Sequence, residues 1–118
     1  MDPVPTSAQP VTRERVLDAR LPKPVSTERV EVRRIRILAG QAAGRHVHNG
    51  PVLGSILEGS VLFQVEGRDE AVLRPGDVFF EPAGVPIAHF DALGEDLTFL
   101  AYFLLSPGQQ PEIVFSDT

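Results

Sequence analysis

Two of the three histidines in this 118-residue chain, His46 and His48, are separated by a single residue. On a β-strand, alternate side chains point to the same face, so the two imidazoles would stand about 6.6 Å apart along the strand. Imidazole nitrogens are common metal ligands in proteins. The pair therefore predicts a metal site, provided that a third protein ligand arrives from elsewhere in the chain.

His89 and Glu81 are the two candidates for that third ligand. A carboxylate can bind Zn, Fe or Mn, and two histidines with one carboxylate and open positions suit a non-haem iron centre. A buried carboxylate would be costly unless it is paired or bound to metal. The alternative interpretations are a solvated glutamate and a histidine that is hydrogen-bonded in a pocket, where its near-neutral pKa would suit it to move a proton.

Short strand patterns separated by turn residues fill the chain from Arg29 onward. Expected strands cover residues 29–38, 45–48, 52–57, 61–66, 71–73, 78–81, 87–92, 97–105 and 112–115. The apolar run 97–105 could form a helix, but its aromatic residues and its context favour a strand buried on both faces. Within the first strand the apolar positions change parity at Arg33 and Arg34, which indicates a bulge or a change of partner. Such closely spaced strands favour an all-β sandwich or barrel.

Five prolines set residues 1–25 apart from this pattern. Prolines at this density disfavour a long helix or a central strand, so we expect a flexible N-terminal tail or arm over residues 1–25. Within it, residues 11–21 could form a short edge strand on a partner subunit or simply an ordered arm. Residues 26–118 are then one domain.

Composition excludes several classes of protein. The net charge of −5 argues against nucleic acid as a partner, because a nucleic-acid-binding surface would be basic. No apolar run is long enough to span a membrane, and the N-terminus has no apolar core of a secretory signal. The chain has no cysteine and therefore no disulfide or thiolate ligand. These features fit a cytoplasmic protein.

Two motifs in the sequence resemble those of the cupins, which are small double-stranded β-helix (jelly-roll) barrels. In the first motif, Gly40 is followed by five residues, then by His46-x-His48, and Gly59 closes it. In the second motif, Gly76 is followed by five residues and then by Pro82-x-Gly84. The resemblance covers roughly residues 30–105 and implies an all-β cupin-type barrel.

The resemblance also implies positions for the metal ligands, which in cupins are usually three histidines and one glutamate. His46 and His48 occupy two of these positions, whereas the glutamate position falls on Pro51 or Val52 and the third histidine position on Ile87. If Ile87 points inward, alternation places His89 on the same face, one strand repeat away. A local slip or bulge could then bring His89 into range of the pair.

From this resemblance we expect a divalent metal (Fe, Mn, Zn or Ni), bound at low occupancy by His46 and His48 with His89 or Glu81. The metal would face a small organic ligand, and an enzyme of this kind would be a dioxygenase, isomerase or lyase. Gln64, Asp91 and Tyr102 are the expected polar contacts to that ligand. The alternatives are a non-catalytic module with an apolar pocket and no metal, and a structural or regulatory dimer without a ligand. We also expect a homodimer, as is common for single-domain cupins.

Overall fold

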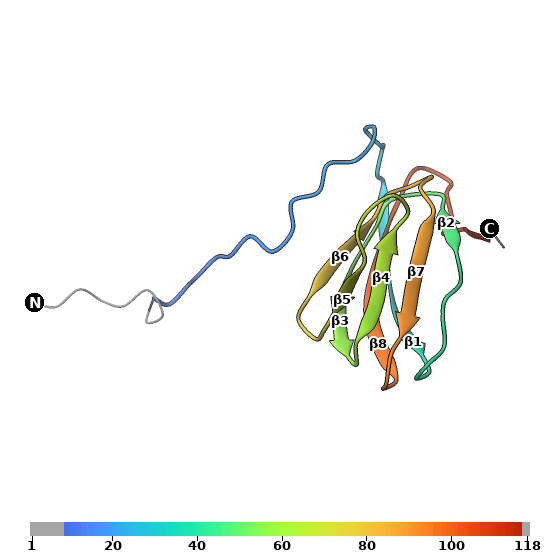
Figure 1. Ribbon diagram of the computed structural model, residues 1–118. Helices are drawn as coiled ribbons and strands as arrows, with labels where there is room; N and C mark the ends of the chain where they lie inside the picture. The colour runs from blue at the N-terminus through green and yellow to red at the C-terminus, as the bar shows by residue number, and fades with distance from the viewer. Residues whose placement is uncertain (1–8, 117–118) are drawn as a thin grey trace, which may run out of the picture.

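Residues 9–116 are described by the computed structural model, and they form nine β-strands and no helix (Figure 1). The expected all-β class is therefore confirmed, and most strand positions agree to within one or two residues. The strands are β1 (Arg29–Ile37), β2 (His46–His48), β3 (Val52–Glu58), β4 (Val61–Val65), β5 (Ala71–Leu73), β6 (Val78–Glu81), β7 (Ile87–Ala92), β8 (Leu97–Leu105) and β9 (Ile113–Phe115).

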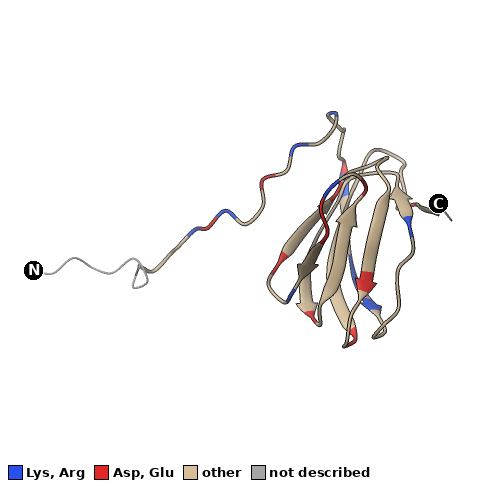
Figure 2. Cartoon of the chain, viewed as in Figure 1, with Lys and Arg blue, Asp and Glu red and all other residues tan. Residues whose placement is uncertain are grey.

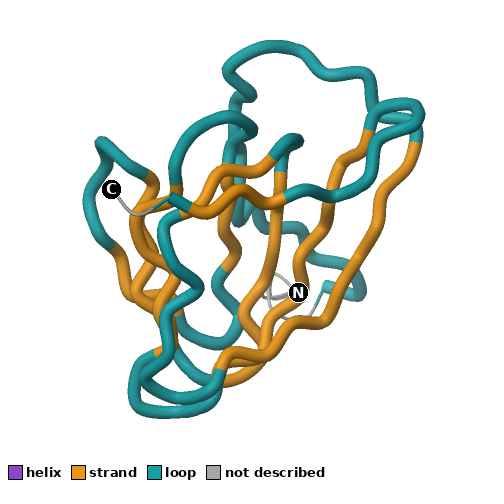
Figure 3. The backbone as a smooth tube through the Cα atoms, turned by 90° about the vertical axis from the view of Figure 1, so that its right-hand side faces the viewer, coloured by secondary structure: helices purple, strands orange, loops and turns teal. Residues whose placement is uncertain are grey.

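The strands form two antiparallel sheets that face each other around a common interior (Figure 3). One sheet has four strands in the order β1-β8-β3-β6, and the other has five in the order β5-β4-β7-β2-β9. The chain changes sheet at every connection except that between β4 and β5. This crossing between sheets is the arrangement of a jelly-roll barrel, and it brings residues that are distant in sequence onto one interior.

Alternating side chains from both sheets fill the interior. Phe79 of β6, Phe90 of β7 and Phe99 of β8 are buried there, with ring centroids 4.8–6.0 Å apart in tilted or edge-on contacts. Aromatic pairs favour such geometries because the positive edge of one ring meets the negative face of the next. The three rings belong to the core and also lie next to the cavity that His46 and His48 line.

β1 differs from the sequence-based expectation, because it contains no bulge. It pairs with β8 in unbroken register from Arg29↔Leu105 to Ile37↔Leu97. The change of parity instead gives β1 apolar side chains on both faces: Ile35 packs against the core, whereas Val32 is 49% exposed on the outer face. β8 likewise alternates between buried and half-buried residues, so only its inner face is fully covered.

An extended segment, residues 9–28, precedes the barrel and has no regular secondary structure (Figure 1). Both basic and acidic residues are distributed along it (Figure 2). Almost all of its residues are exposed. The proposed division into an arm over residues 1–25 and one domain from residue 26 stays a prediction, and residues 1–8 lie outside the described part of the chain. Residues 9–116 include no helix that could cross a membrane.

Candidate metal centre

The histidine pair lies on β2, between β7 and β9, on the interior face of the five-stranded sheet. His46 and His48 are 3% and 8% exposed, and Val47 between them is half-buried on the opposite side. The two imidazole rings are nearly perpendicular, with centroids 4.9 Å apart. Period-two alternation therefore places both rings on one inward face, as the His-x-His spacing predicts.

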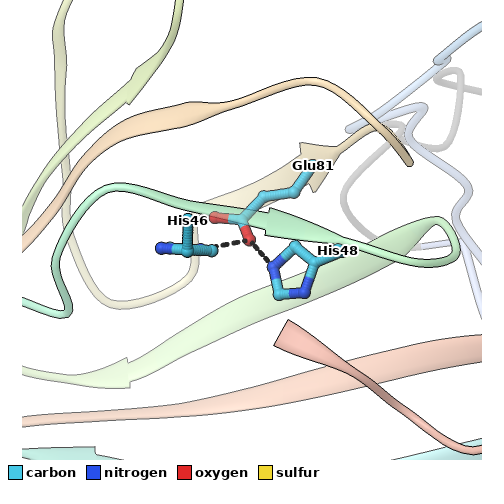
Figure 4. A group of neighbouring side chains, drawn as sticks. All are labelled: His46, His48 and Glu81. Atoms are coloured by element: carbon cyan, nitrogen blue, oxygen red, sulfur yellow. Dashed lines mark hydrogen bonds and ion pairs between the residues drawn. The ribbon is translucent and has the colours of Figure 1, made fainter. Parts of the chain in front are cut away.

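Glu81 meets the pair from the opposite sheet, at the end of β6 (Figure 4). Its Oε1 lies 2.6 Å from Nε2 of His48 and 3.5 Å from Nε2 of His46. One ligand atom from each of the three residues can be chosen so that all lie within 4.8 Å of one another. Glu81 is only 4% exposed, so it is a buried carboxylate whose charge is balanced by the two imidazoles.

Strand pairing explains how this carboxylate replaces the missing one. Val52, one of the two positions on which the cupin glutamate would fall, is the direct cross-strand partner of Glu81. Directly opposite residues have Cβ atoms about 5 Å apart, so the carboxylate has moved to the neighbouring strand of the same sheet. Ile87, at the usual third histidine position, is the cross-strand partner of His46 and is fully buried.

A backbone carbonyl orients the first imidazole. The Nδ1–H of His46 donates a hydrogen bond to the carbonyl oxygen of Gly44 at 2.6 Å. That bond places the Nδ1 proton and leaves Nε2 facing Glu81. Metal-binding histidines are commonly held by such a bond, because it fixes the tautomer and the orientation of the ring.

Burial and the mutual hydrogen bonds shift the pKa values of this cluster. Burial alone would lower the pKa of His46, but the bonds to Glu81 and to Gly44 and the negative charge of Glu81 outweigh it, so the pKa is raised. Burial alone would raise the pKa of Glu81, but the hydrogen bonds from His46 and His48 outweigh it, so the pKa is lowered. Without a metal, the cluster therefore favours a protonated imidazole beside an ionised carboxylate.

The donor set fits a divalent metal ion. Two imidazoles and one carboxylate, all buried and held by rigid strands, are ligands that Zn, Fe and related metals accept. A cation in their midst would compensate the carboxylate charge in place of the imidazole proton. The three residues leave further coordination positions for a ligand, as in a site of two histidines and one carboxylate.

His89 lies outside this cluster, because a β-bulge reverses the alternation that would have placed it inside. Val65 pairs with Ile87 but Gln64 pairs with His89, so Ala88 is an extra residue in β7. After the bulge, Phe90 is buried and His89, 41% exposed in its side chain, faces outward. Its Nδ1 lies 2.8 Å from Oδ2 of Asp91. The expectation that His89 shares the inward face of Ile87 therefore does not hold.

The three residues expected to make polar contacts with a ligand also lie away from the cluster. Asp91 pairs with His89 on the outer face, and Gln64 donates a hydrogen bond from Nε2 to the backbone oxygen of Arg68 at 2.9 Å. Tyr102 alternates with Ala101 and Phe103, both of which line the cavity, so its side chain points to the outer face. Among the described residues, none of the three lines the cavity at the histidine pair.

A cavity of about 200 Å³ opens beside His46, His48 and Glu81. Its walls are mainly apolar and include Ile35, Val52, Phe79, Phe99 and Phe103. Pro111, Glu112 and Ile113 of the C-terminal segment also line it. The C-terminal segment thus forms part of the rim, a feature that the sequence patterns did not indicate. Pockets for drug-sized ligands are larger, at about 300–1,000 Å³, so the ligand that fits here is small.

Arg33 is a cavity residue that the sequence patterns failed to identify. Arg33 lines the cavity together with Ile35 and Ile37. The signal was present in the sequence, because Arg33 has the same parity as the two isoleucines. Arg34 has the opposite parity and lies exposed on the outer face.

Comparison with family models matches residues 33–103, more than half of the chain, to the model described as "Cupin domain". The chain belongs to the cupin family. Its closely matched motifs and its barrel agree with this membership, and the resemblance inferred from the sequence is confirmed. A comparison with curated protein sequences gives no match.

Several solved cupin-fold structures are similar to this one. A Thermus thermophilus protein is 33% identical, with a TM-score of 0.58 and coverage of 70% of this chain and 79% of that one. A cupin-like protein from Thermotoga maritima is 24% identical, with a TM-score of 0.63 and coverage of 75% and 67%. The DMSP lyase DddQ from Ruegeria pomeroyi is 25% identical, with a TM-score of 0.64 and coverage of 74% of this chain. The present chain spans only 43% of that lyase chain.

Proposed function

We propose that this cupin binds one divalent metal ion through His46, His48 and Glu81 and presents it to a small organic ligand in the adjoining cavity. The observation that carries the proposal is the convergence of the three ligand atoms within 4.8 Å, in a buried position, from two different sheets. A bound metal would act as a Lewis acid toward an oxygen atom of the ligand. The reaction would be of dioxygenase, isomerase or lyase type.

The residues of the site have separate roles in this proposal. His46 and His48 hold the metal from one side, and the bond from His46 to Gly44 keeps its Nε2 directed at the site. Glu81 supplies the third ligand and the negative charge, and the carboxylate oxygen left free can accept a proton from the ligand. The apolar walls exclude water around these groups, which strengthens every electrostatic interaction inside the cavity.

The test is elemental metal analysis of tag-free protein, as purified and after loading with Fe, Mn, Zn or Ni. The expected result is up to one metal per chain in the wild type and none in the variants His46→Ala and His48→Ala. His89→Ala is the matched control, because it also removes an imidazole but one that lies outside the cluster. Equal metal content in all four proteins, or no metal under any loading, would refute the metal site.

A second candidate function is a non-catalytic module that binds an apolar small molecule without metal. It is favoured by two buried apolar residues at positions where the family usually carries ligands: Val52, which lines the cavity, and Ile87, the cross-strand partner of His46. In that case Glu81 and the two imidazoles form only a buried ion pair. Retention of small-molecule binding by a metal-free variant would support it.

The assembly we propose is a homodimer formed through the outer face of the four-stranded sheet. That face exposes Val30 and Val32, and β1 is an edge strand with unpaired backbone groups on its free side. Exposed apolar edges of this kind promote association unless they are covered. As its compartment we propose the cytoplasm, where a chain without cysteine needs no oxidising conditions.

A further inference from the structure

We propose that Arg33 is the anchor for a carboxylate group, and that the ligand of this cavity is a small monocarboxylic acid with an apolar body. The inference deepens the proposed function, since it rests on the ligand occupying the cavity beside His46, His48 and Glu81. It adds the chemical class of that ligand and a residue that selects it.

Strand geometry places Arg33 inside the cavity mouth. β1 is continuous with β8, and Arg33 is the cross-strand partner of Ala101, which also lines the cavity. The guanidinium carbon lies 5.3 Å from the ring centroid of Phe103, within the range of a cation–π contact. This contact holds the planar guanidinium over an aromatic wall of the cavity and restricts its orientation.

Phe103 also lies between Arg33 and the group formed by His46, His48 and Glu81, because it contacts both Arg33 and His48. The ring of Phe103 lies 6.2 Å from that of His48, centroid to centroid, in an edge-on arrangement. The sum of the Arg33–Phe103 and Phe103–His48 distances is therefore an upper limit for the distance between the guanidinium carbon of Arg33 and the ring centroid of His48. A molecule of a few carbon atoms can span this distance, with one end at Arg33 and the other end at the two histidines and Glu81.

The charges around the cavity give Arg33 a distinct role. Among the described residues that line the cavity, Arg33 is the single lysine or arginine, and the acidic residues there are Glu81 and Glu112. Its Nε–H donates a hydrogen bond to Oε2 of Glu31 at 2.5 Å. A guanidinium has five N–H donors, and within residues 9–116 only the Nε–H of Arg33 has a recorded hydrogen-bond acceptor. The terminal amino groups can therefore bind a carboxylate in the two-point geometry that arginine favours.

The other walls define the rest of the ligand. Ile35, Ile37, Val52 and Phe99 also line the cavity and present hydrocarbon surface, so the body of the ligand must be apolar. The cavity volume of about 200 Å³ limits that body to a short chain or a small ring. A short-chain monocarboxylate satisfies both requirements, whereas a neutral molecule offers no carboxylate to the terminal amino groups of Arg33.

The test compares hexanoate with hexanamide, a neutral molecule of nearly the same shape, by NMR chemical-shift titration of zinc-loaded protein. The proteins are the wild type, Arg33→Gln and the matched control Arg34→Gln, which removes the neighbouring outward-facing arginine. We expect the wild type and Arg34→Gln to bind hexanoate about tenfold more tightly than hexanamide. Arg33→Gln should lose this preference and keep its affinity for hexanamide.

A second variant reverses the sign of the effect. Glu31→Gln removes the carboxylate that competes for Arg33. Hexanoate should therefore bind to this variant more tightly than to the wild type, whereas the affinity for hexanamide should be unchanged. The zinc content of every sample is measured before titration, and each titration is repeated on metal-free protein. Loss of zinc with retained hexanoate preference would refute the metal site alone. Equal affinities for the two probes in the wild type, or an unchanged preference in Arg33→Gln, would overturn the role of Arg33.

Discussion

Glu81 lies directly opposite Val52 across the pairing of β3 with β6, so the carboxylate of this site comes from the strand beside the one that usually supplies it in cupins. The two positions belong to the same sheet and both face the interior. The site has thus kept a carboxylate near His46 and His48 although neither Pro51 nor Val52 can coordinate a metal. As a result, the cavity wall at position 52 is the hydrocarbon side chain of Val52 and not a carboxylate.

This relationship predicts that the carboxylate can be moved back across the strand pair. Glu81→Val should weaken metal binding by at least about 100-fold, more than the loss typical of residues that only support a ligand. The double variant Val52→Glu/Glu81→Val should recover a large part of that loss, since the opposite Cβ atoms are close. Titration with zinc against a competing chelator measures both effects. Failure of the double variant to bind more tightly than Glu81→Val would contradict the prediction.

The stability of the metal-free protein should depend on pH in two directions. The pKa of His46 is raised, so its contribution to stability is present below its ordinary pKa of 6.5 and is lost as the pH rises through the folded-state value. The pKa of Glu81 is lowered, so its contribution is present above its ordinary pKa of 4.5 and is lost as the pH falls through the folded-state value. We therefore expect the highest urea midpoint between pH 4.5 and pH 6.5, the ordinary pKa values of the two groups.

Two controls make this pH profile specific to the cluster. His46→Gln should abolish the decline on the alkaline side, and His89→Gln should leave it unchanged because His89 pairs with Asp91 elsewhere. Saturating zinc should also remove the alkaline decline, since metal binding displaces the proton. A profile of the same shape in wild type and His46→Gln would show that other groups cause it.

Gly54 of β3 allows the ring of Phe79 to pack against the sheet backbone. A Cβ atom at this position would overlap both the Phe79 ring and the carbonyl oxygen of Leu100. Gly54→Ala should therefore lower the free energy of unfolding by about 1–3 kcal/mol, as overpacking of a core does. Gly94→Ala is the control, because nothing lies within 4 Å of the added atom there. Urea unfolding measures both, and equal midpoints would contradict the packing argument.

The proposed dimer predicts that a charge on the outer face of β1 produces monomers. Val32→Asp places a carboxylate in the exposed apolar face, and burying it at an interface would cost more than the interface gains. Val72→Asp on β5 is the control, since Val72 is also exposed but belongs to the other sheet. Light scattering at micromolar concentration should show a dimer mass for the wild type and Val72→Asp. A monomer mass for the wild type would refute the dimer.

Local patterns in the sequence were sufficient for much of the fold. Alternation of apolar residues and the turn residues between them predicted each strand, because period-two burial and turn chemistry depend on neighbouring residues. The same alternation placed His46 and His48 on one inward face, where the structure has them. It also favoured a strand over a helix for residues 97–105, and β8 covers that range.

Tertiary structure alone decided how the third ligand candidate and the cavity residues are placed. Glu81 joins the histidines only because β6 pairs with β3, and His89 is excluded only because one extra residue in β7 reverses its side. Strand pairing and a one-residue bulge arise from contacts between distant segments, so neither can be read from local periodicity. The parity of Arg33 with Ile35 and Ile37 could be read from the sequence, but it fixes the side of β1 that Arg33 occupies only because β1 pairs with β8 without a bulge.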